Sequence, residues 1–179
     1  MSFRLLSFLG FLACAAGMAF ALYMEFAKGY EPCPMCIFQR VAMIGAGLFF
    51  LAAAVHGPRA VGRWIYALLA AAASLAGAGI AGRHVWLQSL PEDQVPACGP
   101  ALSYLMDMAV SGGNGSWAKI MASVLEVVQM VLKGDGNCAK IDAQWLGVSL
   151  PGWTLIAFIG IALFALVMPK FSRAHANTF

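Results

Sequence analysis

Four long stretches of this 179-residue chain contain no Asp, Glu, Lys or Arg. They cover residues 5–24, 41–58, 64–82 and 143–169, and are 20, 18, 19 and 27 residues long. An α-helix rises about 1.5 Å per residue, so about 20 residues cross the roughly 30 Å hydrocarbon core of a bilayer. A charge at the bilayer centre costs about 2.5–3.5 kcal/mol on insertion scales. The pattern predicts an all-α membrane protein, a four-helix antiparallel transmembrane bundle that forms one domain over residues 1–179.

The composition agrees with lipid as the solvent for much of the surface. Hydrophobic residues make up 61% of the chain and charged residues 11%, whereas soluble domains carry about 25% charged residues. With a mean hydropathy of +0.79, disordered, collagen-like and nucleic-acid-binding classes are excluded. With their ends adjusted, the spans are expected at about residues 5–24, 36–56, 64–83 and 150–169, with loops at about 25–35 and 84–149.

The few charges divide unevenly between the two sides of this expected bundle. Five basic residues and no acid occupy the two tails and the second connection, namely Arg4, Arg59, Arg63, Lys170 and Arg173. The remaining segments hold six basic residues and eight acids, so the sides carry net charges of +5 and −2. By the positive-inside rule, both termini are expected in the cytoplasm and the two loops outside.

The first span has a second interpretation as a cleavable signal peptide. Arg4, the apolar run and the small-residue triplet Ala19-Phe20-Ala21 would fit one. Cleavage would leave three spans and put the C-terminal basic residues outside, against the charge pattern. We therefore expect the first span to remain.

Four of the five cysteines fall on the expected outer side or at its membrane boundary. They are Cys33, Cys36, Cys98 and Cys138, whereas Cys14 lies inside the first span. An even set of cysteines in an oxidising compartment such as a bacterial periplasm implies two disulfides. Cys14 is interpreted as small apolar packing.

Cys33-Pro34-Met35-Cys36 forms a C-x-x-C motif at the mouth of the second span. Proline suits the first turn of a helix, so Cys33 is expected close to a helix N-terminus, where partial positive charge favours a thiolate. The alternative is one half of a zinc site, but neither a second C-x-x-C nor a paired histidine completes a tetrahedral set.

Arg40 follows Cys36 by four residues, which places both on one helix face. Arginine at that depth is costly, so a functional role is the default hypothesis: it stabilises a thiolate or binds an oxygen of a ligand that enters from the lipid. The structural alternative is an arginine that snorkels to the headgroups.

Cys98 and Cys138 enclose 39 residues of the long outer loop. A disulfide closing such a loop would stabilise the fold by about 3–4 kcal/mol in the entropy model, so a structural staple is one interpretation. The second interpretation is a catalytic pair, which the neighbouring Gly and Pro residues favour because they are typical of accessible loop backbone. Between them, residues 117–133 carry an apolar stripe at helical spacing and are expected to form a short interfacial amphipathic helix.

Several motifs follow one another along nearly the whole chain. In order, they are Cys33-x-x-Cys36, Arg40, Arg83-His84, two outer-loop cysteines, Trp145-Leu146-Gly147 and Pro151-Gly152-Trp153. This combination resembles the DsbB family of disulfide bond formation proteins. The resemblance implies a multi-pass thiol oxidase of the bacterial inner membrane with its redox loops in the periplasm. It would reoxidise a DsbA-like protein of the thioredoxin fold and reduce a membrane quinone, ubiquinone or menaquinone, without a metal.

The resemblance also implies roles for individual residues. Cys98 and Cys138 would face the protein substrate, and Cys33 and Cys36 would face the quinone. Arg40 would polarise a quinone oxygen. His84 would lie near the same ring; the structural alternative is an interfacial residue beside Trp86.

Two other functions remain open at this stage. A vitamin K epoxide reductase-like enzyme uses similar parts, but there the loop pair precedes the C-x-x-C, and here the C-x-x-C comes first. A non-enzymatic membrane protein with structural disulfides would need no ionisable residues at membrane depth, whereas Arg40 is expected there.

Overall fold

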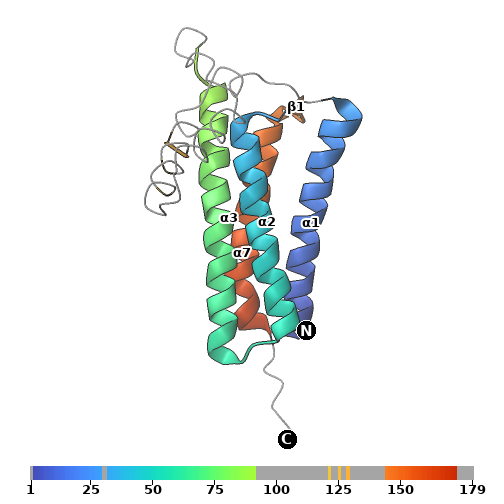
Figure 1. Cartoon of the computed structure of the whole chain (residues 1–179), viewed down its shortest axis with the longest axis vertical. Coiled ribbons are helices and arrows are strands. Elements are labelled where there is room, and N and C mark those ends of the chain that lie inside the picture. The colour runs from blue at the N-terminus through green and yellow to red at the C-terminus, as the bar shows by residue number, and fades with distance from the viewer. Residues whose placement is uncertain are drawn as a thin grey trace, which may run out of the picture.

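The computed structural model describes residues 2–29, 32–91 and 144–172, together with positions 121, 125, 128 and 129. Within these residues, four long helices stand side by side: α1 (Phe3–Lys28), α2 (Pro34–His56), α3 (Ala60–Gln88) and α7 (Leu150–Phe171) (Figure 1). Each is long and apolar enough to cross a membrane. The predicted four-helix membrane architecture is therefore confirmed. Cys98, Cys138 and most of the expected amphipathic helix over 117–133 lie outside the described residues.

Short connections and caps set the direction of the first three helices. Gly29 and Gly57 take left-handed backbone conformations that end α1 and α2, as glycine does at helix C-termini. Only residues 57–59 separate α2 from α3, so the two helices run antiparallel. Helix α3 continues to Gln88, which places His84 on the helix, whereas the sequence suggested a loop from about residue 84.

A two-residue hairpin precedes α7. Strand β1 (Gln144–Trp145) pairs antiparallel with β2 (Val148–Ser149), and Leu146 and Gly147 at its turn both have positive φ. The Trp153 indole donates a hydrogen bond of 3.1 Å to the Trp145 carbonyl. This contact fixes the hairpin over the first turn of α7.

The centre of the bundle combines small side chains on α3 with large buried ones on α2 and α7, and Phe158 of α7 lies directly against Gly77. Helix α3 packs against both α2 and α7. Its buried face is formed by Ala67, Ala70, Ala71, Ser74, Gly77, Ala78 and Ala81. Phe50 of α2 and Phe158 of α7 are fully buried. Because small residues let helix backbones approach closely, this face holds α3 tightly between its partners.

Helix α1 packs against the bundle along only half of its length. Its buried residues are Phe3, Leu6, Ser7, Gly10 and Cys14, all in the first half. Cys14 is 3% exposed and belongs to the apolar core, as predicted. The same helix face continues through Met18 and Ala21 to Glu25, but these residues are only half-buried. They border the cavity described below.

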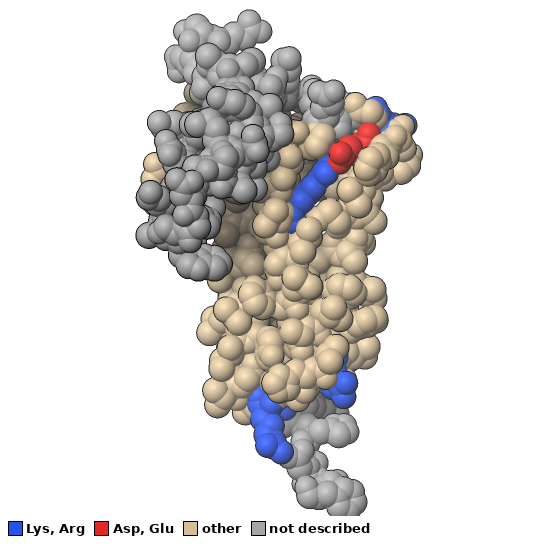
Figure 2. Space-filling model, viewed as in Figure 1, with Lys and Arg blue, Asp and Glu red and all other residues tan. Residues whose placement is uncertain are grey.

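The described charges gather at the two ends of the bundle, and a broad uncharged band separates them (Figure 2). The basic end, formed by the start of α1, the α2–α3 connection and the end of α7, carries Arg4, Arg59, Arg63 and Lys170. The opposite end, which we call the thiol end because it carries Cys33 and Cys36, holds Glu25, Lys28, Arg40 and Arg83. A charge-free band of this kind is what a bilayer core requires.

Gly77 allows a close contact between α3 and α7. A Cβ atom at this position would lie 2.4 Å from two Phe158 ring atoms. We predict that Gly77→Ala lowers the free energy of unfolding by about 1–3 kcal/mol through overpacking, measured by thermal or denaturant unfolding in detergent. Gly79→Ala is the matched control, because no atom lies within 4 Å of a Cβ there. Equal stability of the two variants would contradict this packing.

Candidate functional site

The C-x-x-C motif forms the N-terminus of α2. Cys33 is the N-cap residue, Pro34 opens the helix, and the Cys36 amide donates a hydrogen bond of 3.4 Å to the Cys33 sulfur. The two sulfur atoms lie 3.2 Å apart as hydrogen-bonded thiols. A disulfide bond is about 2.05 Å long, so modest side-chain rotation would join them. The predicted position of Cys33 at a helix N-terminus is confirmed.

The residue between the two cysteines anchors this motif to α3. Met35 is fully buried against Leu87, which is also fully buried. Leu87 follows His84 by three residues, so it lies on the same face of α3 one turn later. Burial of Met35 therefore fixes the start of α2 beside His84.

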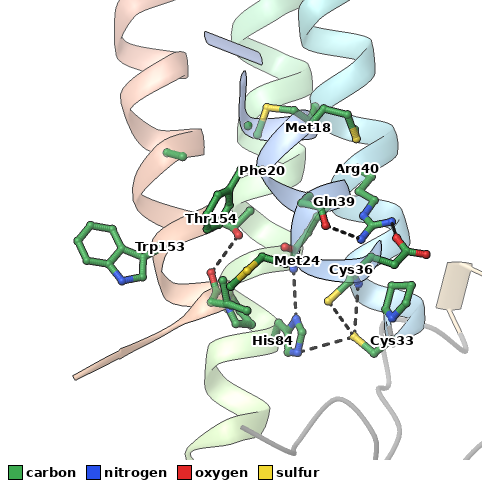
Figure 3. Close-up of a pocket in the computed structure, with 18 of the residues that line it drawn as sticks. Met18, Phe20, Met24, Cys33, Cys36, Gln39, Arg40, His84, Trp153 and Thr154 are labelled. Carbon is green, nitrogen blue, oxygen red and sulfur yellow. Dashed lines mark hydrogen bonds and ion pairs between the residues drawn. The ribbon is translucent and has the colours of Figure 1, made fainter. Parts of the chain in front are cut away.

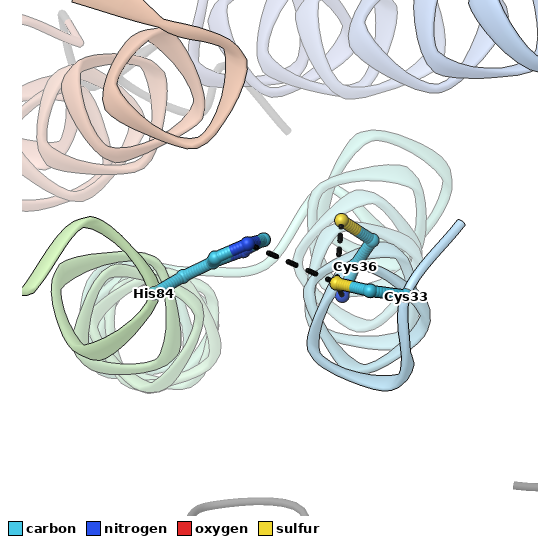
Figure 4. Close-up of side chains that lie close together, drawn as sticks. All are labelled: Cys33, Cys36 and His84. Carbon is cyan, nitrogen blue, oxygen red and sulfur yellow. Dashed lines mark hydrogen bonds between the residues drawn. The ribbon is translucent and has the colours of Figure 1, made fainter. Parts of the chain in front are cut away.

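His84 points from α3 toward the thiols (Figure 4). Its Nε2 atom lies 3.8 Å from the Cys33 sulfur, and the residue is 3% exposed. The donor atoms of Cys33, Cys36 and His84 all lie within 4.8 Å of one another. An imidazole at this distance can accept the proton that a thiol releases. The structure thus brings His84 to the C-x-x-C motif, although it follows Cys33 by 51 positions in the sequence.

Gln39 supports the imidazole from its other side. Its side-chain nitrogen lies 3.3 Å from His84 Nδ1, and the residue is 5% exposed. A side-chain amide has both a donor and an acceptor end, so its orientation selects which ring nitrogen carries the proton. Sequence reasoning missed Gln39. The available signal was a polar amide within a membrane helix, three residues after Cys36.

Arg40 lies one turn deeper than Cys36 and forms an ion pair with Glu25 of α1. Its second terminal nitrogen lies 3.5 Å from the Ala21 carbonyl oxygen. The two charged side chains are only 21% and 26% exposed. Arg40 is therefore neutralised across the α1–α2 boundary and does not extend freely to the headgroups. Glu25 is a second residue that sequence reasoning missed, because its distance from Arg40 depends on how α1 packs.

A cavity of about 370 Å³ opens beside the thiols, between α1 and α7 (Figure 3). Its polar lining includes Cys33, Cys36, Gln39, Arg40, His84, Thr154 and Glu25. Much of the rest is apolar, including Met18, Phe20, Met24, Met43 and Trp153. Phe20 of α1 and Trp153 of α7 line the cavity and are partly exposed, so the cavity is open between two helices that are long and apolar enough to span a membrane.

The cavity has the size and composition of a small-molecule site. Such sites usually measure about 300–1,000 Å³ and combine an apolar wall with a few placed polar groups. Oxidation of the Cys33–Cys36 dithiol to a disulfide releases two electrons and two protons. Since both cysteines line the cavity, the arrangement can pass those electrons to an apolar acceptor bound there.

Comparisons with known proteins agree with the resemblance. A family model described as "Disulfide bond formation protein DsbB" matches residues 3–168. Relatives named "Disulfide bond formation protein B" include one from Hahella chejuensis, 48% identical over 157 residues, 88% of this chain and 87% of the relative. One from Saccharophagus degradans is 45% identical over 160 residues, 89% of each. One from Nitrosococcus oceani is 44% identical over 166 residues, 93% of this chain and 90% of the relative.

No solved structure matches this chain. The sequence matches favour a thiol oxidase of the DsbB type over the vitamin K epoxide reductase-like and non-enzymatic alternatives.

Proposed function

Because this chain belongs to the DsbB family of disulfide bond formation proteins, we propose that it oxidises a periplasmic DsbA-like dithiol protein and passes the electrons to membrane quinone. The observation that carries this proposal is the Cys33–Cys36 pair on the wall of a largely apolar cavity between helices long and apolar enough to span a membrane. A soluble acceptor would not need a mouth between two membrane helices.

The residues around the cavity fit a quinone. Apolar side chains such as Met43 and Phe20 suit a ring and an isoprenoid tail, and the Arg40 guanidinium is a hydrogen-bond donor at the same wall. A bound quinone accepts two electrons and two protons and leaves as quinol. Ubiquinone and menaquinone both meet these requirements.

The inner pair would supply the electrons. Cys36 is the sulfur that faces the acceptor in this scheme, and Cys33 is the one that exchanges with the outer pair. When the dithiol closes to a disulfide, His84 receives a proton at Nε2, 3.8 Å from the Cys33 sulfur. Gln39 holds the imidazole in place through Nδ1, and Nε2 can accept the proton when the Gln39 amide turns its oxygen toward Nδ1. His84 thus has a role in proton transfer in addition to lying near the ring.

The outer pair, Cys98 and Cys138, would connect the inner pair to the protein partner. A partner thiolate attacks Cys98, and the Cys98–Cys138 disulfide breaks to release Cys138. Cys138 then attacks Cys33, and the Cys33–Cys36 bond breaks to release Cys36. The second partner thiolate attacks the partner–Cys98 mixed disulfide, which forms the partner's disulfide and releases Cys98. Cys98 then attacks Cys138, and the Cys138–Cys33 bond breaks to reform the outer disulfide and release Cys33. Each step exchanges one sulfur–sulfur bond for another, so the partner ends oxidised and the inner pair reduced.

Arg40 would polarise a quinone oxygen while Glu25 holds its guanidinium at the cavity wall. Arginine has five N–H donors, so the ion pair with Glu25 leaves others to face the cavity. The pair also joins the loosely packed half of α1 to α2.

The charge distribution supports an orientation with both termini in the cytoplasm and the thiol end toward the periplasm of a bacterial inner membrane. Among the described residues, the basic end has four basic side chains and no acid. Alkaline phosphatase folds only in the periplasm, so a fusion after Ser172 should be inactive and one after Pro91 active. The reverse result would contradict the orientation.

The relay predicts a specific trapped species. In a Cys138→Ser variant, the partner's attack on Cys98 cannot be followed by transfer to Cys33. We expect a mixed disulfide between Cys98 and the reduced partner to accumulate, detected on non-reducing gels, while quinone reduction stops. A Cys14→Ala variant is the matched control and should retain full activity, because Cys14 is buried away from the site in the core. Full quinone reduction after removal of both loop cysteines would end the relay model.

Arg40 and His84 are expected to affect different kinetic parameters. Arg40→Lys loses the planar guanidinium, so the KM for quinone should rise about tenfold, which corresponds to about 1.4 kcal/mol. His84→Ala should mainly lower kcat, by about 10²-fold or more, since general base catalysis typically contributes that factor. Arg59→Lys at the basic end is the control and should change neither. Unchanged kinetics in both site variants would remove them from the reaction.

A further inference from the structure

Cys33, Cys36 and His84 form a set of metal donors as well as a redox site. Their three ligand atoms lie within 4.8 Å of one another. The C-x-x-C alone offered one half of a zinc site, and the third donor was not evident in the sequence because His84 comes from another helix, 51 positions after Cys33. We propose that the reduced Cys33–Cys36 pair and His84 bind a thiophilic divalent cation of the Zn²⁺ type, and that the bound cation holds the pair reduced.

The distances are close to those that tetrahedral zinc requires. Zn–S bonds of about 2.3 Å and Zn–N bonds of about 2.0–2.1 Å put neighbouring donors roughly 3.5–3.8 Å apart. The Cys33 sulfur and His84 Nε2 are 3.8 Å apart, and the two sulfurs are 3.2 Å apart. The sulfurs must separate by about half an ångström. Rotation of the Cys33 side chain can provide this, because Cys33 caps the helix and lies outside its first turn.

Gln39 is placed to give the histidine the second contact that metal-bound imidazoles use. Such ligands usually donate their other ring N–H to a neighbouring acceptor, which fixes the ring orientation. The Gln39 side-chain nitrogen lies 3.3 Å from His84 Nδ1, and the residue is 5% exposed. When this side-chain amide turns over, its oxygen accepts the Nδ1 proton and the Nε2 lone pair faces the sulfurs. Gln39 is thus a positioning residue for the metal ligand.

Charge balance and access also favour binding. Two thiolates and a neutral imidazole neutralise a divalent cation, which reduces the cost of holding it at the membrane boundary. Binding releases the two thiol protons. All three donors line the cavity, so the fourth coordination position can take a water molecule from that side. A closed disulfide has no thiolates, so only the reduced pair forms the site.

Metal binding by itself is independent of the proposed function, whereas its inhibitory effect rests on that function. Thiolates that coordinate a cation cannot close to a disulfide. The cation would therefore compete with quinone for the same reduced pair, so that the metal supply controls the fraction of active enzyme.

The test uses the full chain in detergent with Cys98→Ser and Cys138→Ser, so that Cys33, Cys36 and Cys14 are the remaining thiols. After reduction by a phosphine, Co²⁺ alone is titrated as the spectroscopic probe, and Zn²⁺ is then added to displace it. We expect sulfur-to-cobalt charge-transfer absorption that saturates at one equivalent and is absent from the oxidised protein. Loss of this absorption on mutation of Cys36→Ser would identify the pair as its source.

Variants of the histidine and its support distinguish the three-ligand site from a simple dithiol. His84→Ala should weaken Co²⁺ binding by at least 10-fold, and Gln39→Ala by about 10-fold or more, as expected for a partner that orients a ligand. Cys14→Ala and His56→Ala are the controls, and both should bind as the parent does. Circular dichroism of each variant establishes that the helices have formed.

Two outcomes would overturn the site: equal affinity in the parent and His84→Ala, or no saturable thiolate absorption in the reduced parent. The inhibition is tested separately, on the unmodified chain with quinone and reduced partner. Zn²⁺ should slow turnover over the concentration range in which it displaces Co²⁺. Unchanged turnover would overturn the inhibition. No turnover in metal-free buffer would instead contradict the proposed function and leave the metal site standing.

Discussion

The small-residue face of α3 determines where the reactive groups lie. Seven alanine, serine and glycine positions let α3 lie close against α2 and α7, and the stripe continues directly into His84 and Leu87. Helix packing at this distance leaves little freedom of register, because large side chains such as Phe158 fit only where a glycine faces them. Leu87 then meets Met35, the residue between the two cysteines. The 3.8 Å approach of His84 to Cys33 is thus a consequence of packing along the whole bundle.

The cavity, in contrast, lies where α1 no longer packs closely against the rest of the bundle. Helix α1 is held to the bundle by its first half, and the Arg4 side chain donates a 2.8 Å hydrogen bond to the Ala54 carbonyl at the basic end. Beyond Cys14 the helix has no buried residue, and the space beside α7 becomes the cavity. The Arg40–Glu25 ion pair is the contact that closes the α1–α2 side of this space. The wall that carries the sulfurs belongs to the tightly packed α2 and α3, while the α1 wall has only half-buried and exposed residues.

The sequence predicted those features that depend on local spacing. Four charge-free stretches of sufficient length identified the four helices, and the four-residue spacing of Cys36 and Arg40 put them on one face, where both line the cavity. Helix ends were less predictable, because α3 continues past the charged Arg83 to Gln88. An arginine near a helix end can stack its charged guanidinium on an aromatic ring, as Arg83 does with its Cζ atom 4.0 Å from the centre of the Trp86 ring.

Contacts between helices could not be predicted in this way. Gln39 and Glu25 look like an ordinary polar residue and an ordinary outer acid in the sequence, and only the register of α1 and α3 against α2 gives them partners. The loop cysteines Cys98 and Cys138 lie outside the described residues, so their part in the relay stays a prediction.

The central claim is that Cys33 and Cys36 deliver their electrons to a quinone in the adjoining cavity. It is tested most directly in the Cys98→Ser, Cys138→Ser protein, reduced, freed of excess reductant and mixed anaerobically with one equivalent of quinone. We expect one quinol to form per protein, and mass spectrometry of the digested chain should find a disulfide joining Cys33 to Cys36. Quinone that remains oxidised while both thiols stay reactive toward alkylation would contradict it.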